Sequence, residues 1–400
     1  MLDAWANILQ FIDNDKDKCQ ILMASKQMLK CKCYFRKCID IREIYGHTLF
    51  NNFSNVSIRY DTDIFPSHMT HLIIDYYLIQ PMNITIPDTV KYLTFGHFFN
   101  QPITIKIPDT VTHITFGHYF NQCIDNCFPS RLTHLFFGYR FNQPIYGCIP
   151  QSVTHLTFTG HFNQPVDGCI PSVITSECVD TFKHYGSYLP KSITHLTFGS
   201  CFNRSVIIPS SVIYLRFGYW FDSDVKIPSS VKYLKFGFSF NKYVKIPPTV
   251  THLTFGESFN RNVDDMIFPF VTHLTFKGEE TSLKKFIPLT HFKFKSNHNK
   301  IPSTVIHLSM DNICYGNNEI KIPSSVIHLT FNGGCCQATK NFIPKSVTHL
   351  FIYRIYCNLY IPSSVKEIHI INKIERTRKV YINDSKEEKI YQGFVKDVFK

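Results

Sequence analysis

Several sequence signatures are missing from this chain of 400 residues, and their absence narrows its function. It contains no G-x-x-x-x-G-K-[ST] loop for phosphates, no dinucleotide fingerprint, no H-E-x-x-H zinc motif and no G-x-S-x-G nucleophile turn. Its 30 acidic residues are few and dispersed. We therefore expect no catalysis and no cofactor.

Long apolar runs, secretion signals and blocks of charge are also missing. No stretch reaches 18 apolar residues, so no transmembrane helix is expected. Residues 1–10 include Asp3, carry no basic residue and show no small-residue cleavage site, so no signal peptide is predicted. The net charge of +12 is scattered, without a run of five like charges. We expect a cytoplasmic chain with no membrane contact.

The 14 cysteines fit a reducing compartment. Cys127, Cys148 and Cys169 each stand two residues before a repeated proline, so they should stack as a column. Their Cα atoms would approach disulfide distance, but reduced, buried thiols are favoured because free cysteine is a good small core residue. The N-terminal C-x-C-x₄-C run matches no zinc spacing, so no metal site is expected.

What the chain does contain is one phrase in many copies. Its clearest copy is IPDTVTHITFGHYFN, residues 107–121, and close copies begin at Ile86 and Ile246. A period this short fits one turn of a solenoid rather than a domain. Sixteen prolines, mostly 19 or 21 residues apart, anchor the copies: Pro66, Pro87, Pro108, Pro129, Pro150, Pro171, Pro190, Pro209, Pro228, Pro247, Pro269, Pro288, Pro302, Pro323, Pro344 and Pro362.

Each copy has a fixed pattern when it is numbered from the valine that follows the proline, so that Val111 is position 1. Positions 1, 4, 6 and 10 are apolar and predict a continuous core, and V-T-H-I-T-F predicts a short strand. Glycine at position 7 should let the chain turn. Asparagine at position 11 should bond the backbone of neighbouring turns. The segment that leads from the end of one phrase to the next proline, for example PITIK before Ile107, should be extended, and we call it the return segment.

Position 3 is histidine in eleven copies and tyrosine in three. Two interpretations are open: a metal ladder or pH switch, or a stacked ring ladder that stabilises the sheet. The second is favoured, because a strand ladder offers a flat line of rings rather than convergent ligands. The histidines are His71, His113, His134, His155, His195, His252, His273, His291, His307, His328 and His349, and the tyrosines are Tyr92, Tyr214 and Tyr233.

Positions 8 and 9 vary where the rest of the phrase repeats, and they lie in the bend just after the strand. Aromatic side chains and arginine are common anchors of protein interfaces, although some of these residues could simply pack between turns. The predicted target-binding residues are Phe98, Tyr119, Tyr139, Arg140, Tyr219, Trp220 and Phe238.

The phrase V-x-x-L-x-F followed by F-N resembles the FNIP repeat, which belongs to the leucine-rich-repeat class. The resemblance covers residues 63–370 and implies a mainly β solenoid, an LRR-like parallel stack of about 16 turns. A turn of 19–21 residues leaves no room for an α-helix on the convex side of the solenoid.

Residues 1–45 lack the repeat and show helical periodicity. Leu2, Trp5, Ile8, Leu9 and Ile12 form one apolar face. The run NILQFIDNDKDKCQILMASKQ resembles an F-box, although the Leu-Pro opening typical of that family is absent. The resemblance implies a surface for a Skp-family adaptor, made by Leu2, Ile8, Leu9, Phe11 and Ile12. The alternative is a helical cap for the solenoid.

These features predict four segments and two possible functions. Residues 1–45 form the F-box-like helical domain, 46–62 a transition with one atypical turn, 63–383 the FNIP solenoid, and 384–400 a C-terminal cap with a closing helix. The resemblance, which looks like proteins of amoebae and their giant viruses, implies a monomeric substrate receptor of a Skp–cullin–F-box ubiquitin ligase, located in the host cytoplasm if a virus encodes it. The alternative is a binding scaffold without a ubiquitin role; nucleic-acid binding is not expected.

Overall fold

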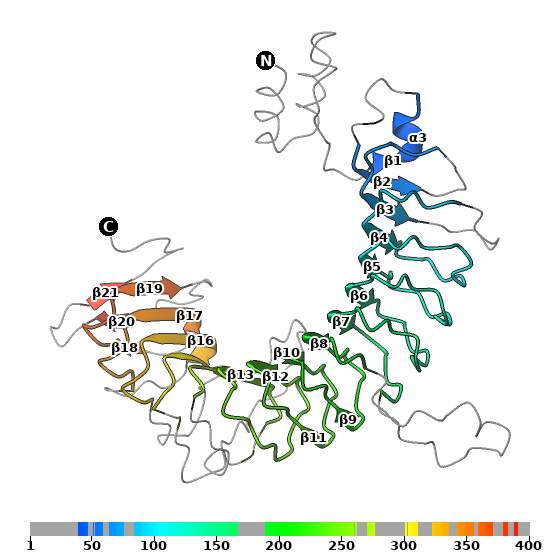
Figure 1. Ribbon diagram of the computed structural model, residues 1–400. Coiled ribbons are helices and arrows are strands. Elements are labelled where there is room, and N and C mark those ends of the chain that lie inside the picture. Colours follow the sequence, from blue (N-terminus) through cyan, green and yellow to red (C-terminus); the bar gives the residue numbers. More distant parts are fainter. Residues whose placement is uncertain are drawn as a thin grey trace, which may run out of the picture. The chain divides into compact units, whose positions relative to one another are not determined.

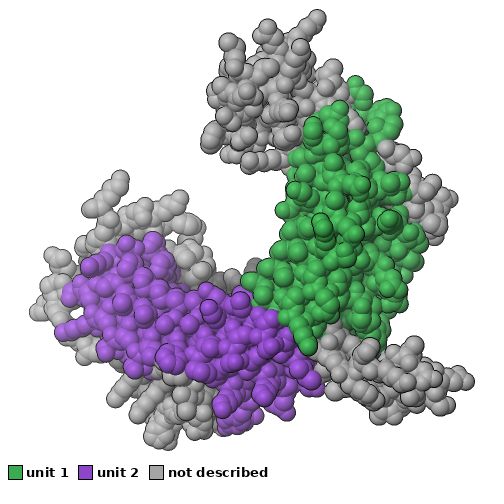
Figure 2. Space-filling view, in the orientation of Figure 1, with its two compact units in different colours: residues 1–199 green, residues 200–400 purple. Residues whose placement is uncertain are grey.

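The computed structural model describes residues 39–46, 51, 53–58, 64–75, 84–166, 189–259, 261, 270–276, 301, 303–310, 322–335, 342–355, 359–370, 379–382 and 388–390. The chain divides into two compact units, residues 1–199 (unit 1) and 200–400 (unit 2), shown in Figure 2. Each unit stacks one parallel strand per turn (Figure 1). Among the described residues, no helix has the length and hydropathy that a membrane span requires.

Unit 1 contains a parallel sheet whose strands pair in chain order. One short helix, α3 (Ile41–Ile44), follows the first strand, and the side chain of Asp40 caps it by accepting from the backbone N–H of Arg42. The strands are β1 (Ile39–Asp40), β2 (Asn55–Ile58), β3 (His71–Ile74), β4 (Tyr92–Phe95), β5 (His113–Thr115), β6 (His134–Phe137), β7 (His155–Phe158) and β8 (His195–Thr197).

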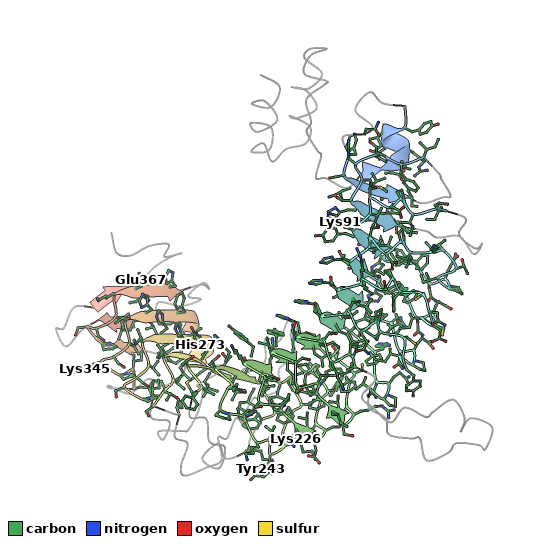
Figure 3. All side chains as sticks on the ribbon, viewed as in Figure 1. Lys91, Lys226, Tyr243, His273, Lys345 and Glu367 are labelled. Carbon is green, nitrogen blue, oxygen red and sulfur yellow. The ribbon has the colours of Figure 1, made fainter. Side chains whose placement is uncertain are left out.

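Unit 2 contains a parallel sheet in the order β10-β12-β13-β14-β15-β16-β17-β19. These strands are β10 (Tyr214–Arg216), β12 (Tyr233–Lys235), β13 (His252–Phe255), β14 (His273–Phe276), β15 (His307–Met310), β16 (His328–Cys335), β17 (His349–Ile355) and β19 (Glu367–Ile370). A two-stranded parallel sheet joins β9 (Val206–Ile207) and β11 (Val225–Lys226), so these return segments are extended, as predicted. His273 lies on the strand side of this unit, and Lys226 and Tyr243 lie on the return side (Figure 3).

The register pairs equal positions of successive copies, which confirms the repeat as the structural unit. Tyr92 stands opposite His113, and His113 stands opposite His134. Because side chains alternate across a strand, every turn then sends positions 4 and 6 inward and positions 3 and 5 outward. The burial of β7 follows this alternation.

The predicted core is confirmed. In the copy that begins at Val111, positions 1, 4, 6 and 10 are all at most 1% exposed: Val111, Ile114, Phe116 and Phe120. Phe116 stacks on Phe95 and Phe137 in the turns on either side, with ring centroids 5.0 and 5.3 Å apart. No single turn encloses these rings by itself, so the stack of turns supplies the core.

Each proline starts a tight turn that delivers the chain to its strand. The carbonyl of Pro108 accepts from the backbone N–H of Val111 at 3.0 Å, and Pro129 and Leu132 repeat the bond at 3.2 Å. A proline has no N–H, and here only its carbonyl is needed. The turn places position 1 in the core of the next turn.

Glycine at position 7 is required for a reason the sequence analysis did not give. A Cβ added at Gly117 would lie far inside van der Waals contact with the carbonyl of Gly96, and one at Gly138 would meet the carbonyl of Gly117 in the same way. Neither glycine is among the residues with positive φ. Close approach of neighbouring backbones, rather than turn conformation, therefore selects glycine at this position.

The asparagine at position 11 has the predicted role. The Oδ1 atom of Asn100 accepts from the backbone N–H of Asn121 at 2.8 Å. In the next two turns, Oδ1 of Asn121 accepts from the N–H of Asn142, and Oδ1 of Asn142 accepts from the N–H of Asn163. In unit 2, Asp222 takes the same place and accepts from the N–H of Asn241 at 2.7 Å. These side chains connect each turn to the next at the end of the bend.

A glutamine ladder at position 12 reinforces the asparagines and was not predicted. The Nε2 atom of Gln143 donates to the backbone carbonyl of Asn121 at 3.0 Å and to its Oδ1 at 3.1 Å. Gln122 and Gln164 donate to Asn100 and Asn142 in the same way. The sequence signal was the F-N-Q of four consecutive copies, ending at Gln101, Gln122, Gln143 and Gln164; later copies keep the asparagine, replaced once by Asp222, and lose the glutamine.

We expect Asn121→Ala to lower the free energy of unfolding by about 1–2 kcal/mol, because the N–H of Asn142 loses its acceptor and the amide of Gln143 loses one of its two. Asn121→Asp should lose less, since Asp222 shows that a carboxylate oxygen accepts the same bond. Chemical denaturation of the three proteins measures the difference. Equal stability of Asn121→Ala and the wild type would remove the ladder as a source of stability.

Four sequence-based expectations need correction. β7 pairs directly with β8, and β14 directly with β15, so the copies at Pro171 and Pro288 add no strand to the sheets and the count of sixteen FNIP turns is too high. β20 (Lys379–Ile382) lies within the range predicted for the FNIP solenoid but joins a separate sheet with β18 (Leu359–Ile361). The predicted closing helix is contradicted at β21 (Glu388–Ile390), which pairs antiparallel with β20. Cys127 and Cys148 are free, as predicted, but they are only half-buried; Cys169 lies outside the described residues.

Most of the predicted N-terminal helical domain lies outside the part of the chain that the structure describes. Residues 1–38 lie outside the described residues, and with them the F-box-like run and its predicted adaptor-binding side chains. β1 falls within the range predicted for that domain and pairs with β2, so the sheet already includes residues 39–40. The four predicted segment boundaries stay predictions.

Candidate functional site

The bends that follow the strands are held by their own backbone ladder. In unit 1 the N–H of Tyr119 donates to the carbonyl of His97 at 3.1 Å, Arg140 donates to His118 at 2.8 Å, and His161 donates to Tyr139 at 2.7 Å. Each position 9 is thus bonded to position 8 of the preceding turn. A bend fixed in this way presents its side chains on a rigid support.

The side chains at positions 8 and 9 of three consecutive bends form the surface that we call the bend ladder of unit 1. It consists of His97, Phe98, His118, Tyr119, Tyr139 and Arg140. The predicted binding residues among them are exposed: Phe98 by 49%, Tyr119 by 38% and Tyr139 by 42%, and Arg140 is exposed as well. Large aromatic side chains at such exposure, gathered on one edge, are unusual on a surface without a partner.

The rings of the bend ladder stack on one another. Phe98 and Tyr119 lie with centroids 5.3 Å apart and planes 15° apart. His118 stacks on His97 on one side and on Tyr139 on the other, each at 4.9 Å. The guanidinium of Arg140 lies 5.5 Å from the centroid of Tyr119, within reach of a cation–π contact. The structure therefore brings the predicted residues of unit 1 together.

Unit 2 carries a smaller version of the same surface. Tyr219 is 40% exposed and Trp220 is 55% exposed. Tyr219 stacks on Phe238 at 4.5 Å, and Trp220 meets the edge of Tyr219 at 4.7 Å. Phe238 is only half-buried rather than fully exposed, because Tyr219 covers one of its faces. The predicted residues of unit 2 also lie in contact.

The rings at position 3 form a second column, on the outer face of the strands. In unit 1, His113, His134 and His155 stack with centroids 4.0 Å apart. In unit 2, His252 stacks on His273 at 4.0 Å, and the column continues to His349. The stacked ring ladder favoured from the sequence is confirmed. Because β14 pairs directly with β15, the column passes from His273 to His307 and does not include His291 between them.

A threonine at position 2 orients most of these histidines, a contact that sequence reasoning missed. Thr133 Oγ1 lies 2.9 Å from His134 Nδ1 and donates to the carbonyl of Thr112 at 3.0 Å. A hydroxyl has one hydrogen, so Nδ1 of His134 must be the donor to Thr133, and Nε2 is left as an outward acceptor. The recurring T-H dipeptide was the available signal.

This arrangement bears on metal binding. The Nε2 lone pairs of parallel stacked rings run side by side, whereas a metal needs convergent ligands. Within the part of the chain that the structure describes, no group of three His, Cys, Asp or Glu residues could hold a metal ion.

Most histidines of the column have a lowered pKa. Partial burial, followed by the charges of His134 and His195, lowers the pKa of His155 to about 4. Burial and neighbouring imidazoles likewise lower the pKa of His113 and of His273. Glu367, at the end of the column in unit 2, lies 3.7 Å from His349 and is the carboxylate that acts on this column among the described residues.

We expect stability to fall as the pH drops below about 6.5, the pKa of histidine in an unfolded chain. The unfolded chain then binds more protons than the folded chain, and the loss should continue toward the folded pKa, about 4 for His155. Melting temperatures between pH 7.5 and 5 measure the effect. His134→Tyr/His155→Tyr should reduce it, since tyrosine already fills the column at Tyr92. A melting temperature independent of pH would contradict this account.

Two thiols share one carboxylate on the return side of unit 1. Asp125 accepts from Cys123 through Oδ2 and from Cys148 through Oδ1, each at 2.9 Å. Burial, and then the Asp125 carboxylate, raises the pKa of Cys148 to about 12, and burial raises that of Cys127 to about 12. The thiols of Cys127 and Cys148 are therefore protonated and poor nucleophiles at neutral pH.

The predicted adaptor-binding residues, Leu2, Ile8, Leu9, Phe11 and Ile12, all lie outside the described residues. Nothing in the structure places them, and their role stays a prediction.

Comparison with known proteins agrees with the repeat. The profile described as "FNIP Repeat" matches residues 99–140, 141–176, 186–220, 221–258 and 317–354. No curated protein matches the chain.

One solved structure, described as "The crystal structure of CroV588 a novel circular LRR protein structure", is 25% identical to this chain. The match covers 80% of this chain and 63% of that one, with a TM-score of 0.43, so the fold assignment rests on the turns described above rather than on this likeness. One parallel strand per turn of 19–21 residues is the geometry of the leucine-rich-repeat class. The chain is an FNIP repeat protein with an LRR-like fold.

Proposed function

We propose that the chain is a protein-binding module that reads its target with the bend ladder of unit 1 and the equivalent bend residues of unit 2. The observation that supports this proposal is the exposure of stacked aromatic rings and an arginine on a backbone ladder. Tyrosine, tryptophan and arginine dominate binding energy at protein interfaces. Rings already ordered by stacking lose little conformational freedom on binding.

The finer form of this proposal is a substrate receptor of a Skp–cullin–F-box ubiquitin ligase. Its support is the resemblance of residues 1–45 to an F-box together with the FNIP repeats. In this form the N-terminal helices dock a Skp-family adaptor, the bend ladder holds the target, and the chain itself performs no catalysis. A scaffold without a ubiquitin role is the alternative if the adaptor does not bind.

The coarse proposal is tested by affinity purification of the full chain from the cell that makes it. Phe98→Ala/Tyr119→Ala should lose at least one protein that the wild type retains. Tyr146→Ala is the matched control, because it removes an exposed tyrosine outside the bend ladder of the same unit. Loss of no protein from the double variant, or the same loss from the control, would contradict the proposal.

The finer proposal is tested with a purified Skp-family adaptor. Leu9→Asp/Ile12→Asp should abolish adaptor capture, because it buries unpaired charges in the interface. Asn7→Asp/Gln10→Asp adds the same charge at polar positions of the same predicted helix and should bind normally. If the wild type captures no adaptor, or the two variants behave alike, the ligase role is wrong and residues 1–45 act as a cap.

A further inference from the structure

We infer that the bend ladder of unit 1 binds an acidic peptide segment, one whose carboxylates alternate with aromatic side chains. This inference rests on the proposed protein-binding function and specifies the chemistry of the partner. Three features of the described residues lead to it. The rings expose their edges, Arg140 places a positive charge beside them, and the bends contain no carboxylate.

The first feature is that the rings present their edges. Phe98 and Tyr119 each cover one face of the other, Arg140 lies over Tyr119, and His118 is stacked between His97 and Tyr139. What solvent reaches is therefore mostly the ring perimeter. The edge of an aromatic ring carries the positive part of its quadrupole and favours acceptors and other π-faces. A row of edges attracts carboxylate oxygens and aromatic faces.

The second feature is Arg140, which extends the ladder with a permanent positive charge. It is exposed, it lies over Tyr119, and its backbone N–H is fixed to His118. A guanidinium binds a carboxylate through two parallel hydrogen bonds. Because partial burial and the charges of His97 and Arg140 lower the pKa of His118, Arg140 carries the positive charge of the ladder at neutral pH.

The third feature is the lack of carboxylates in these bends. Residues 96–101, 117–122, 138–143 and 159–164 contain no aspartate and no glutamate. Asp75 lies beside Gly96, at one end of these bends. No acidic side chain of the bends therefore competes for Arg140, and an acidic partner meets no repulsion across the ladder. The charge complementarity selects an acidic segment over a basic one.

The same geometry disfavours a single-stranded nucleic acid. Bases bind such proteins by stacking on open aromatic faces. Here both sides of His118, one face of Phe98 and one face of Tyr119 are covered by neighbouring rings, and Arg140 also lies over Tyr119, so a phosphate backbone could contact Arg140 but the bases would find few open faces. Nucleic-acid binding is an outcome that the experiment can reveal.

The test uses the full chain and four fluorescein-labelled probes in anisotropy titrations at low salt. The probes are a peptide of alternating Glu and Phe, the same peptide with Lys for Glu, the same peptide with Gln for Glu, and oligo(dT). We expect binding of the Glu peptide, at least tenfold weaker binding of the Gln peptide, and none of the Lys peptide. Arg140→Glu should weaken binding of the Glu peptide by at least about tenfold.

Arg131→Glu is the matched control, because Arg131 is also an exposed arginine of unit 1 but lies outside the bends. It should bind the Glu peptide like the wild type, and Arg140→Lys should retain part of the affinity. Thermal melting confirms that each variant is folded. The inference is overturned if the Glu peptide does not bind, if the Lys peptide binds as well, if the two Arg→Glu variants lose affinity equally, or if oligo(dT) binds more tightly and depends on Arg140.

Failure of this inference is distinguishable from failure of the proposed function. If the Glu peptide does not bind while Phe98→Ala/Tyr119→Ala still loses a cellular protein, the bend ladder binds a protein but not one with an acidic segment. If the double variant also loses nothing, the protein-binding function of the ladder is itself wrong.

Discussion

Phe116→Ala should lower the free energy of unfolding by about 3–5 kcal/mol, the usual range for truncating a buried phenylalanine. Phe116 is 1% exposed and contacts four other rings: Phe95 and Phe137 in the adjacent turns, Phe120 in its own, and Phe128 edge-on. Removing it opens a cavity that faces two turns at once. The loss should therefore appear as faster hydrogen exchange in β4, β5 and β6, in addition to a lower midpoint in urea.

Thr115→Ala is the control for this substitution. Thr115 is the neighbouring residue, but it lies on the outer face of β5 and is only half-buried. It should cost less than about 1 kcal/mol, as most surface substitutions do. If Thr115→Ala is the more destabilising of the two, the inward and outward faces have been assigned the wrong way round.

Gly117→Ala should be the second large effect, about 3 kcal/mol at the upper end of overpacking. The added Cβ would collide with the carbonyl of Gly96 in the preceding turn, which is backbone and cannot move without separating the two turns. The measurement is chemical denaturation of the full chain.

Gly147→Ala separates this collision from ordinary backbone strain. Gly147 has φ of +67°, but a Cβ there would meet nothing within 4 Å. It should cost about 1–2 kcal/mol, the penalty of a left-handed conformation for an L-residue. A larger loss at Gly147 than at Gly117 would show that turn conformation, rather than the spacing of the turns, selects these glycines.

The repeat made most of the fold predictable. Many similar phrases share one apolar pattern, so the inward positions of Phe116 and Phe120 could be predicted from periodicity, and Asn121 from its recurrence at the end of the bends. The stacking of the position-3 rings followed from parallel strands in register. Repetition also placed Phe98 and Tyr119, both at position 9, and Tyr139, at position 8, on one edge, because each position of one turn lies beside the same position of the next.

Other features could not be read from one turn taken alone. The need for Gly117 depends on how closely the backbone of Gly96 approaches, which a single phrase does not contain. The bond from His134 to Thr133 depends on side-chain direction. The copy at Pro171 has lost the Phe and Asn signals of the other copies, which predicts a departure from the pattern, but only strand pairing shows that β7 meets β8 directly. The partner depends on exposed ring edges, which follow from stacking between turns.

The most direct test of the account is to locate the bound protein on the surface. A photo-crosslinking benzoylphenylalanine is introduced in place of Tyr119 in the bend ladder, or in place of Tyr146 as an exposed control in the same unit. After irradiation in the cell that makes the chain, the account predicts that a protein partner is joined to the chain at position 119 and not at 146. The same partner joined equally at both positions, or at 146 alone, would contradict the claim that the bend ladder reads the target.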